Sequence, residues 1–369
     1  MKRLIGVLGC GGIIGYAACK ELLKGYNVKG GQRKQPDKLL GVPGFSWKKT
    51  NLFQLSSLRE FCKGCDAVLN CAGPSYKIKE KIANIALEEG AIYIDVSDVI
   101  LNDKTVKFKK NGIYILGSGY VPGSSGMIPF LIANDFNHIE KMYCFQGGRQ
   151  NLSKIAFADL MINSIGNSGY PNTYIQNAKI IKDNIKSNKQ YYIPGMKENV
   201  FIKPYISTEL LEVCKELKIE ELHWYNAVPD KLMIDMIQES YQSFTQFDIN
   251  TAILEAQDKL KEISSIFDQK QWSTLVYDVF GSKAGTYIRK RYVIELEDSN
   301  TFCGKIAALT VKRTLESNLS SGVFWAMELV KNNIPELKQC LLENSTYTEI
   351  LLPYNSEEIL SVEMETDFI

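Results

Sequence analysis

A glycine-rich turn near the start of the chain constrains the fold more than any other feature of the sequence. The run Leu4–Leu8 is apolar apart from Gly6 and suits a parallel strand buried on both faces. Glycines follow at positions 9, 11, 12 and 15, and a helix is expected from Ile13 to Lys24. A strand that enters a helix through such a turn aims backbone N–H groups and the positive helix end at one point. The stretch therefore predicts a pyrophosphate site.

The glycines of this turn have separate predicted roles. Gly9 permits the tight turn, Gly11 or Gly12 lets the backbone approach the phosphates, and Gly15 lets the helix pack closely on the strand. The alternative is a glycine-rich turn from strand to helix that binds no ligand. The predicted cofactor contacts of this stretch are Gly9, Gly11, Gly12, Ile13 and Ile14.

The end of the second predicted strand bears on the choice between NAD and NADP. This strand runs from Tyr26 to Gly31, and its end lies where an acidic side chain would hold the ribose 2′-hydroxyl of NAD. No acid stands there, whereas Arg33 and Lys34 offer positive charge for a 2′-phosphate, and the arginine fork suits its geometry. The sequence therefore favours NADP over NAD. Alternatively, both side chains are solvated loop charges.

Short strands and helices alternate through the first third of the chain. Strands are expected at 45–47, 66–71, 92–96 and 113–116, with helices at 55–62 and 77–89. This alternation is typical of βαβ units, so we expect a Rossmann-type, doubly wound parallel sheet of the α/β class. Ligands bind at the carboxyl ends of such strands. The further predicted cofactor contacts are Cys71, Ala72, Gly73, Pro74, Asp95 and Ser97.

The pattern changes near residue 124 and predicts a second, α+β domain. Strands are expected at 142–145, 199–202 and 221–227, helices at 155–165 and 208–217, and a polar loop at 171–194. Residues 271–296 should form a hairpin with a five-residue loop at 281–285. Two further helices, at 303–315 and 323–331, should pack back on the first domain and leave a cleft between the domains. The predicted domains are 1–123, 124–300 and 301–345, with a tail at 346–369.

Composition excludes several classes of partner. The 369 residues carry 43 basic and 42 acidic side chains and no long basic stripe, so neither nucleic acid nor an anionic membrane is an expected partner. No apolar run reaches the ~20 residues that span a bilayer, which favours a cytoplasmic protein. Nine scattered cysteines and two histidines predict reduced thiols and no metal site. The expected partners are a substrate, free or carried by a protein or peptide, and a second copy in a homodimer.

Several stretches together resemble the saccharopine dehydrogenase-like family. They are GVLGCGGIIG from Gly6, GGQRKQPDKL from Gly30, SLREFCKGCDAVLNCAGPSY from Ser57 and ALEEGAIYIDVSD from Ala86. Looser matches are GYVPGSSGMIP from Gly119, FQGGRQ from Phe145 and AALTVKRTLESNLSSGVFWAMEL from Ala307. The resemblance implies a Rossmann-type domain, a nicotinamide cofactor and hydride transfer, often at a carbon–nitrogen bond of an amino acid.

Three functions follow as hypotheses. The first is an NADP-dependent oxidoreductase acting on a C=N or C–N bond of an amino-acid-like substrate. The second is an NADPH-dependent reductase of a C=C bond in a tailoring intermediate, with the Met- and aromatic-rich segment 233–247 walling an apolar cavity. The third is a nicotinamide-binding protein without turnover.

The candidate proton donors are polar residues that we expect near the strand ends or in the second domain. They are His223, Lys77, Asp98 and Tyr120. His223 has an intrinsic pKa suited to general acid catalysis, although a buried structural histidine is the alternative. Arg149 follows two glycines at a strand end and is a candidate ligand for a substrate carboxylate, as is Tyr120 for the substrate. Lys77 could instead be an exposed lysine, and Asp98 a helix cap.

Overall fold

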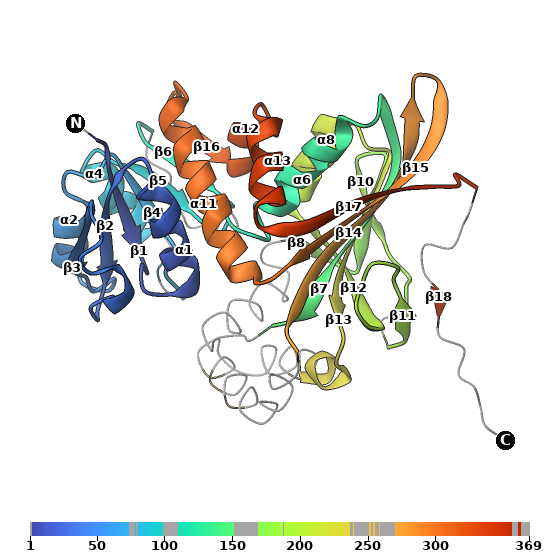
Figure 1. Cartoon of the computed structure of the whole chain (residues 1–369), viewed down its shortest axis with the longest axis horizontal. Helices are drawn as coiled ribbons and strands as arrows, with labels where there is room; N and C mark the ends of the chain where they lie inside the picture. The colour runs from blue at the N-terminus through green and yellow to red at the C-terminus, as the bar shows by residue number, and fades with distance from the viewer. Residues whose placement is uncertain are drawn as a thin grey trace. The chain divides into compact units, whose positions relative to one another are not determined.

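The chain forms two compact units (Figure 1). The computed structural model describes residues 2–73, 78, 80–98, 110–150, 169–186, 188–236, 239, 251, 254, 258, 270–355 and 361–362. Unit 1 combines Met1–Leu131 with Ser299–Cys340, and unit 2 combines Ile132–Asp298 with Leu341–Ile369. The chain thus leaves unit 1 after Leu131 rather than after residue 123, because helix α6 (Ser124–Ala133) begins in unit 1.

Unit 1 is built on a seven-stranded sheet in the order β16-β6-β5-β4-β1-β2-β3. Every neighbouring pair in this sheet is parallel, as predicted. The order 3-2-1-4-5-6 of its first six strands is that of a Rossmann-type fold. The strands are β1 (Leu4–Leu8), β2 (Asn27–Gln32), β3 (Phe45–Lys49), β4 (Ala67–Asn70), β5 (Ile92–Asp95), β6 (Ile113–Leu116) and β16 (Gly322–Trp325).

Helices bury the faces of this sheet. Leu58 and Phe61 of α2 and Ile82 of α4 join Tyr93 of β5 in one apolar cluster. Elsewhere α11 approaches α1 closely at Gly304, where a Cβ atom would lie 2.3 Å from the Ile14 carbonyl oxygen. Burial of the strands explains why they are apolar runs rather than alternating sequences. The helical elements are α1 (Ile13–Leu22), η1 (Asp37–Leu39), α2 (Leu55–Cys62), α4 (Lys81–Glu88), α11 (Ser299–Glu316), α12 (Ala326–Val330) and α13 (Ile334–Leu342).

Unit 2 is an α+β unit around a mixed sheet. Its main path is β17-β15-β14-β7-β13-β12-β11-β18, with β7 parallel to β13 and the other pairs on the path antiparallel. Its apolar cluster includes Phe145, Ile202, Tyr225 and Val276. The path contains β7 (His138–Arg149), β11 (Gln190–Tyr192), β12 (Val200–Ser207), β13 (Glu221–Val228), β14 (Trp272–Lys283), β15 (Thr286–Leu296), β17 (Ser345–Leu352) and β18 (Ser361–Val362).

Helix α8 (Thr208–Leu217) begins and ends where the sequence predicts. Ser207 caps it by accepting a hydrogen bond from the Leu210 backbone N–H at 3.2 Å. A serine in this position satisfies one of the N–H groups that the first helical turn leaves unpaired.

The prediction of a polar loop at 171–194 is wrong. Four short strands occupy this region: β8 (Gly169–Pro171), β9 (Thr173–Gln176), β10 (Lys179–Lys182) and β11. They are polar because they lie at the margins of the sheet, where many of their side chains are exposed. Asn177 and Ala178 both have positive φ and close the β9–β10 hairpin in two residues.

Three further predictions need correction, one in the hairpin and two near the C-terminus. The β14–β15 hairpin turns through Ala284 and Gly285 rather than five residues, because both strands extend to the Lys283–Thr286 pair. The predicted helix at 323–331 is strand β16 followed by α12, since the β-forming residues 323–325 pair with β6. Residues 346–352 are not a tail, because β17 pairs with β15 along its whole length.

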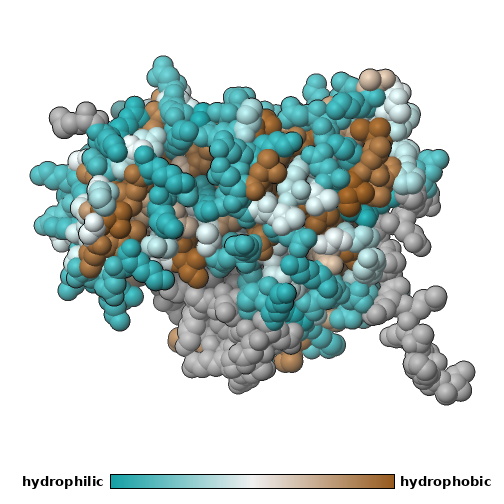
Figure 2. All heavy atoms as spheres, in the orientation of Figure 1, coloured by the Kyte–Doolittle hydropathy of each residue, from teal (hydrophilic) through white to brown (hydrophobic). Residues whose placement is uncertain are grey.

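Some sequence predictions lie outside the described residues. These are the helix at 155–165, most of the segment 233–247, Pro74 and Lys77. The helices within the described residues are each too short or too polar to cross a membrane. On the face seen in Figure 2 the surface is mainly hydrophilic, with hydrophobic residues interspersed in small groups.

Candidate functional site

The turn between β1 and α1 has the geometry of a phosphate cradle. Gly9 has φ +77°, a value that favours glycine, and a Cβ atom there would lie 2.9 Å from the Cys71 carbonyl oxygen. At Gly15 a Cβ atom would lie 2.2 Å from the Gly9 carbonyl oxygen. The neighbour of a Cβ atom at Gly12 would be that same oxygen at 3.4 Å, so the space beside Gly12 is open. Two glycines are therefore required by packing, and Gly12 leaves room for a ligand.

Helix α1 begins directly behind this open space. Gly12 is its N-cap, and the Gly12 N–H donates to the Gly9 carbonyl oxygen at 3.0 Å. Ile13 and Ile14 form the first helical turn, where backbone N–H groups have no partner within the helix. An anion in the open space would meet these N–H groups and the positive end of the helix dipole.

Gln32, for which the sequence predicts no role, ties the end of β2 to the glycine turn. Its Oε1 accepts a hydrogen bond from the Gly11 N–H at 2.6 Å, and its Nε2 donates to the Lys34 carbonyl oxygen at 2.7 Å. Its position in the sequence could have indicated this role, because Gln32 ends the second strand, where an NAD-binding protein carries an acidic residue. A neutral amide at this point does not repel a phosphate.

Arg33 and Lys34 follow Gln32 and are exposed. The Gln32 amide holds the backbone of this segment beside the glycine turn, so both cations belong to the surroundings of the cradle. Lys38 extends the positive charge of the region, with its Nζ 5.6 Å from the centre of the Tyr16 ring.

A buried polar network fixes the ends of β4 and β5. The Asp95 carboxylate accepts hydrogen bonds from Asn70 Nδ2 at 3.0 Å, from the Tyr93 hydroxyl, and from the Ser97 N–H and Oγ at 2.9 and 3.0 Å. Burial raises the pKa of Asp95, although bonds from Tyr93, Ser97 and Asn70 oppose the shift. These bonds occupy the Asp95 and Ser97 side chains, which were predicted as cofactor contacts, and brace the loops at the edge of the sheet.

The other predicted residues of unit 1 follow the carboxyl ends of the strands. Cys71, Ala72 and Gly73 follow β4 and are partly buried, and the Ala72 N–H donates to Asn70 Oδ1 at 3.1 Å. Asp98 follows β5 and is buried, with 3% of its surface exposed. Tyr120 follows β6, is half-buried and meets Phe302 of α11 edge to face at 6.1 Å. The structure thus brings all these residues to one edge of the sheet.

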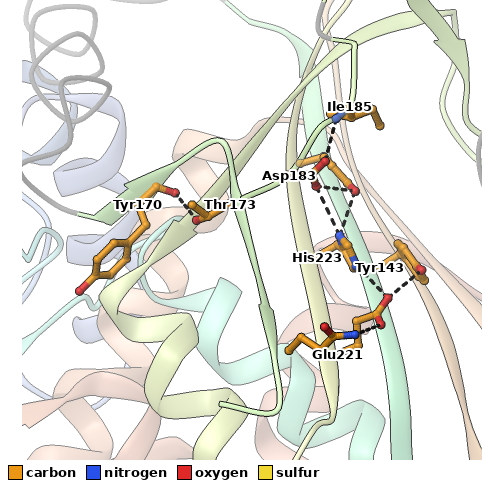
Figure 3. A network of polar contacts seen from close by, with 9 residues as sticks. Tyr143, Tyr170, Thr173, Asp183, Ile185, Glu221 and His223 are labelled. Carbon is orange, nitrogen blue, oxygen red and sulfur yellow. Dashed lines mark hydrogen bonds and ion pairs between the residues drawn. The ribbon is translucent and has the colours of Figure 1, made fainter. Parts of the chain in front are cut away.

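His223 lies in unit 2, in the middle of a dense network on β13 (Figure 3). Its Nε2 lies 3.0 Å from Glu221 Oε1, and its Nδ1 lies 3.0 Å from the Tyr225 hydroxyl and 3.5 Å from Asp183 Oδ2. Two tyrosine rings, of Tyr143 and Tyr174, stack on the imidazole at centroid distances of 4.6 and 4.3 Å. Both ring nitrogens and both ring faces are thus engaged, which favours a structural role.

The same network shifts the pKa values of its acids. Burial alone would raise the pKa of Asp183, but hydrogen bonds from His223, the Ile185 N–H and Tyr225 outweigh it and lower the pKa. Burial alone would also raise the pKa of Glu221, but hydrogen bonds with His223 and Tyr143 outweigh this effect and lower the pKa. Burial and the neighbouring carboxylates raise the pKa of Tyr225. The cluster therefore keeps two carboxylates ionised around the imidazole.

Arg149, the predicted carboxylate ligand, already holds two carboxylates of the protein. Its Nε and Nη2 donate to the two oxygens of Glu198, both at 2.7 Å, and its Nη1 donates to Asp230. The indole of Trp272 adds a hydrogen bond to Glu198 at 2.6 Å. A substrate carboxylate would have to displace one of these acids, so we do not retain Arg149 as a substrate ligand.

Taken together, these observations define a Rossmann-type α/β unit with a glycine-rich turn and an α+β unit. In the described part of the chain, no group of three or more His, Cys, Asp or Glu side chains could hold a metal ion. The nine cysteines are free thiols, most of them buried.

The fold is that of saccharopine dehydrogenases. Apo saccharopine dehydrogenase (L-Glu forming) from Saccharomyces cerevisiae superposes with a TM-score of 0.65 at 11% identity, over 95% of this chain and 100% of that one. A short-chain dehydrogenase/reductase from Veillonella parvula in complex with NADP matches 26% of this chain and 48% of its own, at 17% identity and a TM-score of 0.24, too low to carry an argument. Comparisons with family models and with curated proteins gave no match.

Proposed function

We propose that the protein is an NADP-dependent oxidoreductase that transfers a hydride to or from a C=N or C–N bond of an amino-acid-like substrate. The observation that carries the cofactor assignment is the cradle between β1 and α1, with open space at Gly12 and packed backbone at Gly9 and Gly15. The fold, which is that of a saccharopine dehydrogenase, supports the choice of bond. A bound nicotinamide cofactor would supply or accept the hydride.

Several residues of unit 1 would hold this cofactor. The N–H groups at the start of α1 suit its pyrophosphate, and Arg33 and Lys34 suit a 2′-phosphate. The neutral Gln32 supports the choice of NADP, because a carboxylate in its place would repel that phosphate. Asp98 and Tyr120, at the same edge of the sheet, are the described residues of unit 1 that we propose as proton donor candidates.

The test of the cofactor assignment is a fluorescence titration with NADPH and NADH. We expect tighter binding of NADPH, and Arg33→Ala should weaken NADPH binding about tenfold or more while leaving NADH binding nearly unchanged. Arg59→Ala is the matched control, because Arg59 pairs with Glu88 and Glu89 on the surface. Equal binding of both cofactors by the wild-type protein would contradict the assignment.

The test of the reaction is NADPH oxidation at 340 nm with pairs of amino acids and 2-oxo acids. Turnover that requires both an amine and a carbonyl compound supports chemistry at a C=N bond. Turnover with an unsaturated acid alone would instead support reduction of a C=C bond. Tight NADPH binding without turnover of any of these substrates would support the third hypothesis, a nicotinamide-binding protein without catalytic activity.

A further inference from the structure

One arm of the sheet in unit 2 is attached to the rest of the sheet through a short ladder. The arm consists of the β9–β10 hairpin and the turn after it, residues 173–185. Strand β9 joins β13 through two residue pairs, at Glu221 and Leu222. The Asn177 N–H adds a hydrogen bond to the Glu220 carbonyl oxygen at 2.7 Å. With so short a ladder, side-chain contacts carry a large share of the attachment.

Two side chains of the arm meet His223 of β13. The Tyr174 ring stacks on the imidazole at a centroid distance of 4.3 Å and an interplanar angle of 8°. Asp183 Oδ2 lies 3.5 Å from His223 Nδ1, as Figure 3 shows. The Tyr143 ring of β7 covers the other face of the imidazole at 4.6 Å. His223 is therefore the point where the arm meets two central strands of the sheet.

The hydrogen-bond partners of His223 place acceptors on both sides of its ring. Glu221 Oε1 lies 3.0 Å from Nε2 and also accepts a bond from the Tyr143 hydroxyl at 3.1 Å. On the other side, the Tyr225 hydroxyl lies 3.0 Å from Nδ1 and 3.0 Å from Asp183 Oδ2. A hydroxyl has one proton to donate, and an ionised carboxylate can only accept. Every acceptor is satisfied when Tyr225 donates to Asp183 and both ring nitrogens carry a proton.

A neutral imidazole fits this arrangement less well. With its proton on Nε2 it keeps the bond to Glu221, but Nδ1 becomes an acceptor and takes the Tyr225 proton. Asp183 then loses that bond and faces an unprotonated nitrogen at 3.5 Å. The pKa values of Asp183 and Glu221 are both lowered despite their burial, so neither acid supplies the missing proton at neutral pH. Loss of the second ring proton therefore weakens the contact between the arm and β13.

The charges around the ring also favour its protonated form. Aromatic faces attract cations, and two carboxylates flank the ring edges. Lys141 of β7 attracts Glu221 as well, but among the described residues His223 alone forms an ion pair with either acid. The titratable groups that face the ring are Asp183 after β10, Tyr174 of β9, Tyr143 of β7, and Glu221 and Tyr225 of β13.

We propose that His223 is a proton-dependent anchor for the arm at residues 173–185. The protonated ring holds Asp183 and Tyr174, and loss of its proton releases them, so the arm opens locally as the pH rises. Acid loosens the arm too, once Asp183 and Glu221 take up protons. The arm is therefore held most firmly between these two limits. This inference goes beyond the oxidoreductase function and does not depend on a bound cofactor.

Hydrogen exchange of the wild-type protein at about pH 5.5 and about pH 9 tests the anchor. These values lie on either side of the range in which histidines ordinarily lose their proton. After correction for the intrinsic exchange rate, the protection of residues 173–185 should fall about tenfold or more at the higher pH, because a charge-assisted contact is lost. Peptides from β1 and β4 should keep their protection. An unchanged arm, or an equal loss in all these peptides, would overturn the inference.

His223→Gln keeps a polar side chain but cannot carry the charge. Its arm should exchange at about pH 5.5 as fast as the wild-type arm does at about pH 9, with no dependence on pH between them. His138→Gln is the matched control, because His138 is the other histidine of the chain and is exposed beside Glu220. It should behave as the wild type does. A wild-type pH dependence in His223→Gln would refute the anchor.

A second measurement needs no substitution at His223. In His138→Gln the remaining histidine is His223, so histidine labelled with ¹⁵N gives NMR signals from its two ring nitrogens alone. Both nitrogens should be protonated at about pH 5.5, and the loss of one proton should follow the same pH curve as the loss of protection in the arm. Two separate curves, or an unprotonated nitrogen at about pH 5.5, would refute the inference even if His223→Gln failed to fold.

Discussion

At the residue scale, two glycines of the same turn are needed for different reasons. A Cβ atom at Gly15 would lie 2.2 Å from the Gly9 carbonyl oxygen, which is backbone and cannot move freely. A Cβ atom at Gly12 would lie 3.4 Å from the same oxygen. The first glycine is therefore required for folding of the turn, and the second is available to a ligand.

This contrast gives a prediction for two substitutions. Gly15→Ala should lower the free energy of unfolding by about 1–3 kcal/mol, because the backbone must shift to admit the methyl group. Gly12→Val should keep the fold and abolish NADPH binding, because the branched side chain fills the open space. Urea unfolding followed by circular dichroism, with a cofactor titration on the same samples, checks both. Wild-type stability of Gly15→Ala would contradict the close packing at Gly15. Full NADPH affinity of Gly12→Val would contradict the assignment of the open space to the cofactor.

The network around His223 predicts a dependence of stability on pH. The pKa of Asp183 is lowered below its ordinary 3.8 in the folded protein, so its ionised form stabilises the fold. This contribution is fully present above the unfolded pKa and is lost as the pH falls through the folded one. Wild type should exceed Asp183→Asn in unfolding free energy at about pH 6, and the difference should shrink at about pH 3.

Urea titrations at the two pH values measure this difference. Asp37→Asn is the control, because Asp37 lies exposed in η1. A difference that stays constant with pH would mean that the charge of Asp183 does not contribute.

At the element scale, the β14–β15 hairpin turns through residues that are not equally suited to it. Ala284 has φ +49° and Gly285 φ +80°, so both central residues are left-handed. A turn of this type favours Asn-Gly, whereas alanine is strained in that region. The Ala284 N–H also donates to Asn137 Oδ1 at 2.7 Å, a bond that any residue except proline can keep.

Ala284→Asn should therefore stabilise the protein by about 0.5–1 kcal/mol. Gly285→Ala is the opposite change and should destabilise it by a similar amount or more, although no atom within 4 Å would meet the added Cβ. The midpoint of chemical denaturation is the measurement. If both variants match the wild type, the turn does not retain these dihedral angles in solution.

At the scale of the whole molecule, unit 1 is assembled from two separate stretches of chain. Helix α11 follows the first of the two segments of unit 2, and it packs on α1 so closely that Gly304 has no room for a side chain. Unit 1 therefore depends on residues nearly 300 positions after its first strand.

Gly304→Ala should weaken unit 1 in particular, because the added Cβ would lie 2.3 Å from the Ile14 carbonyl oxygen. Pulse proteolysis with mass spectrometry should detect earlier cleavage within residues 2–131 than in the wild type. Gly25→Ala serves as the control, since a Cβ atom there has no neighbour within 4 Å. Identical cleavage of all three proteins would mean that α11 does not support the unit.

The sequence by itself determined the fold class of unit 1, because the signals for it are local. Apolar runs, a glycine turn and helix boundaries act over a few residues, so a doubly wound parallel sheet and the position of the glycine turn could be predicted. Local signals fail at the margins of the sheet in unit 2, where strands β8 to β11 are polar and where the sequence predicts a tail in place of β17.

Only the tertiary structure decided the partners of individual polar groups. The sequence cannot show that Arg149 is held by Glu198 and Asp230, since these acids come from loops far along the chain. Nor can it show that Tyr143 and Tyr174 stack on His223, because strand register depends on packing of the whole sheet. Contacts between polar side chains that are far apart in the sequence depend on strand register and burial, and no short motif encodes either.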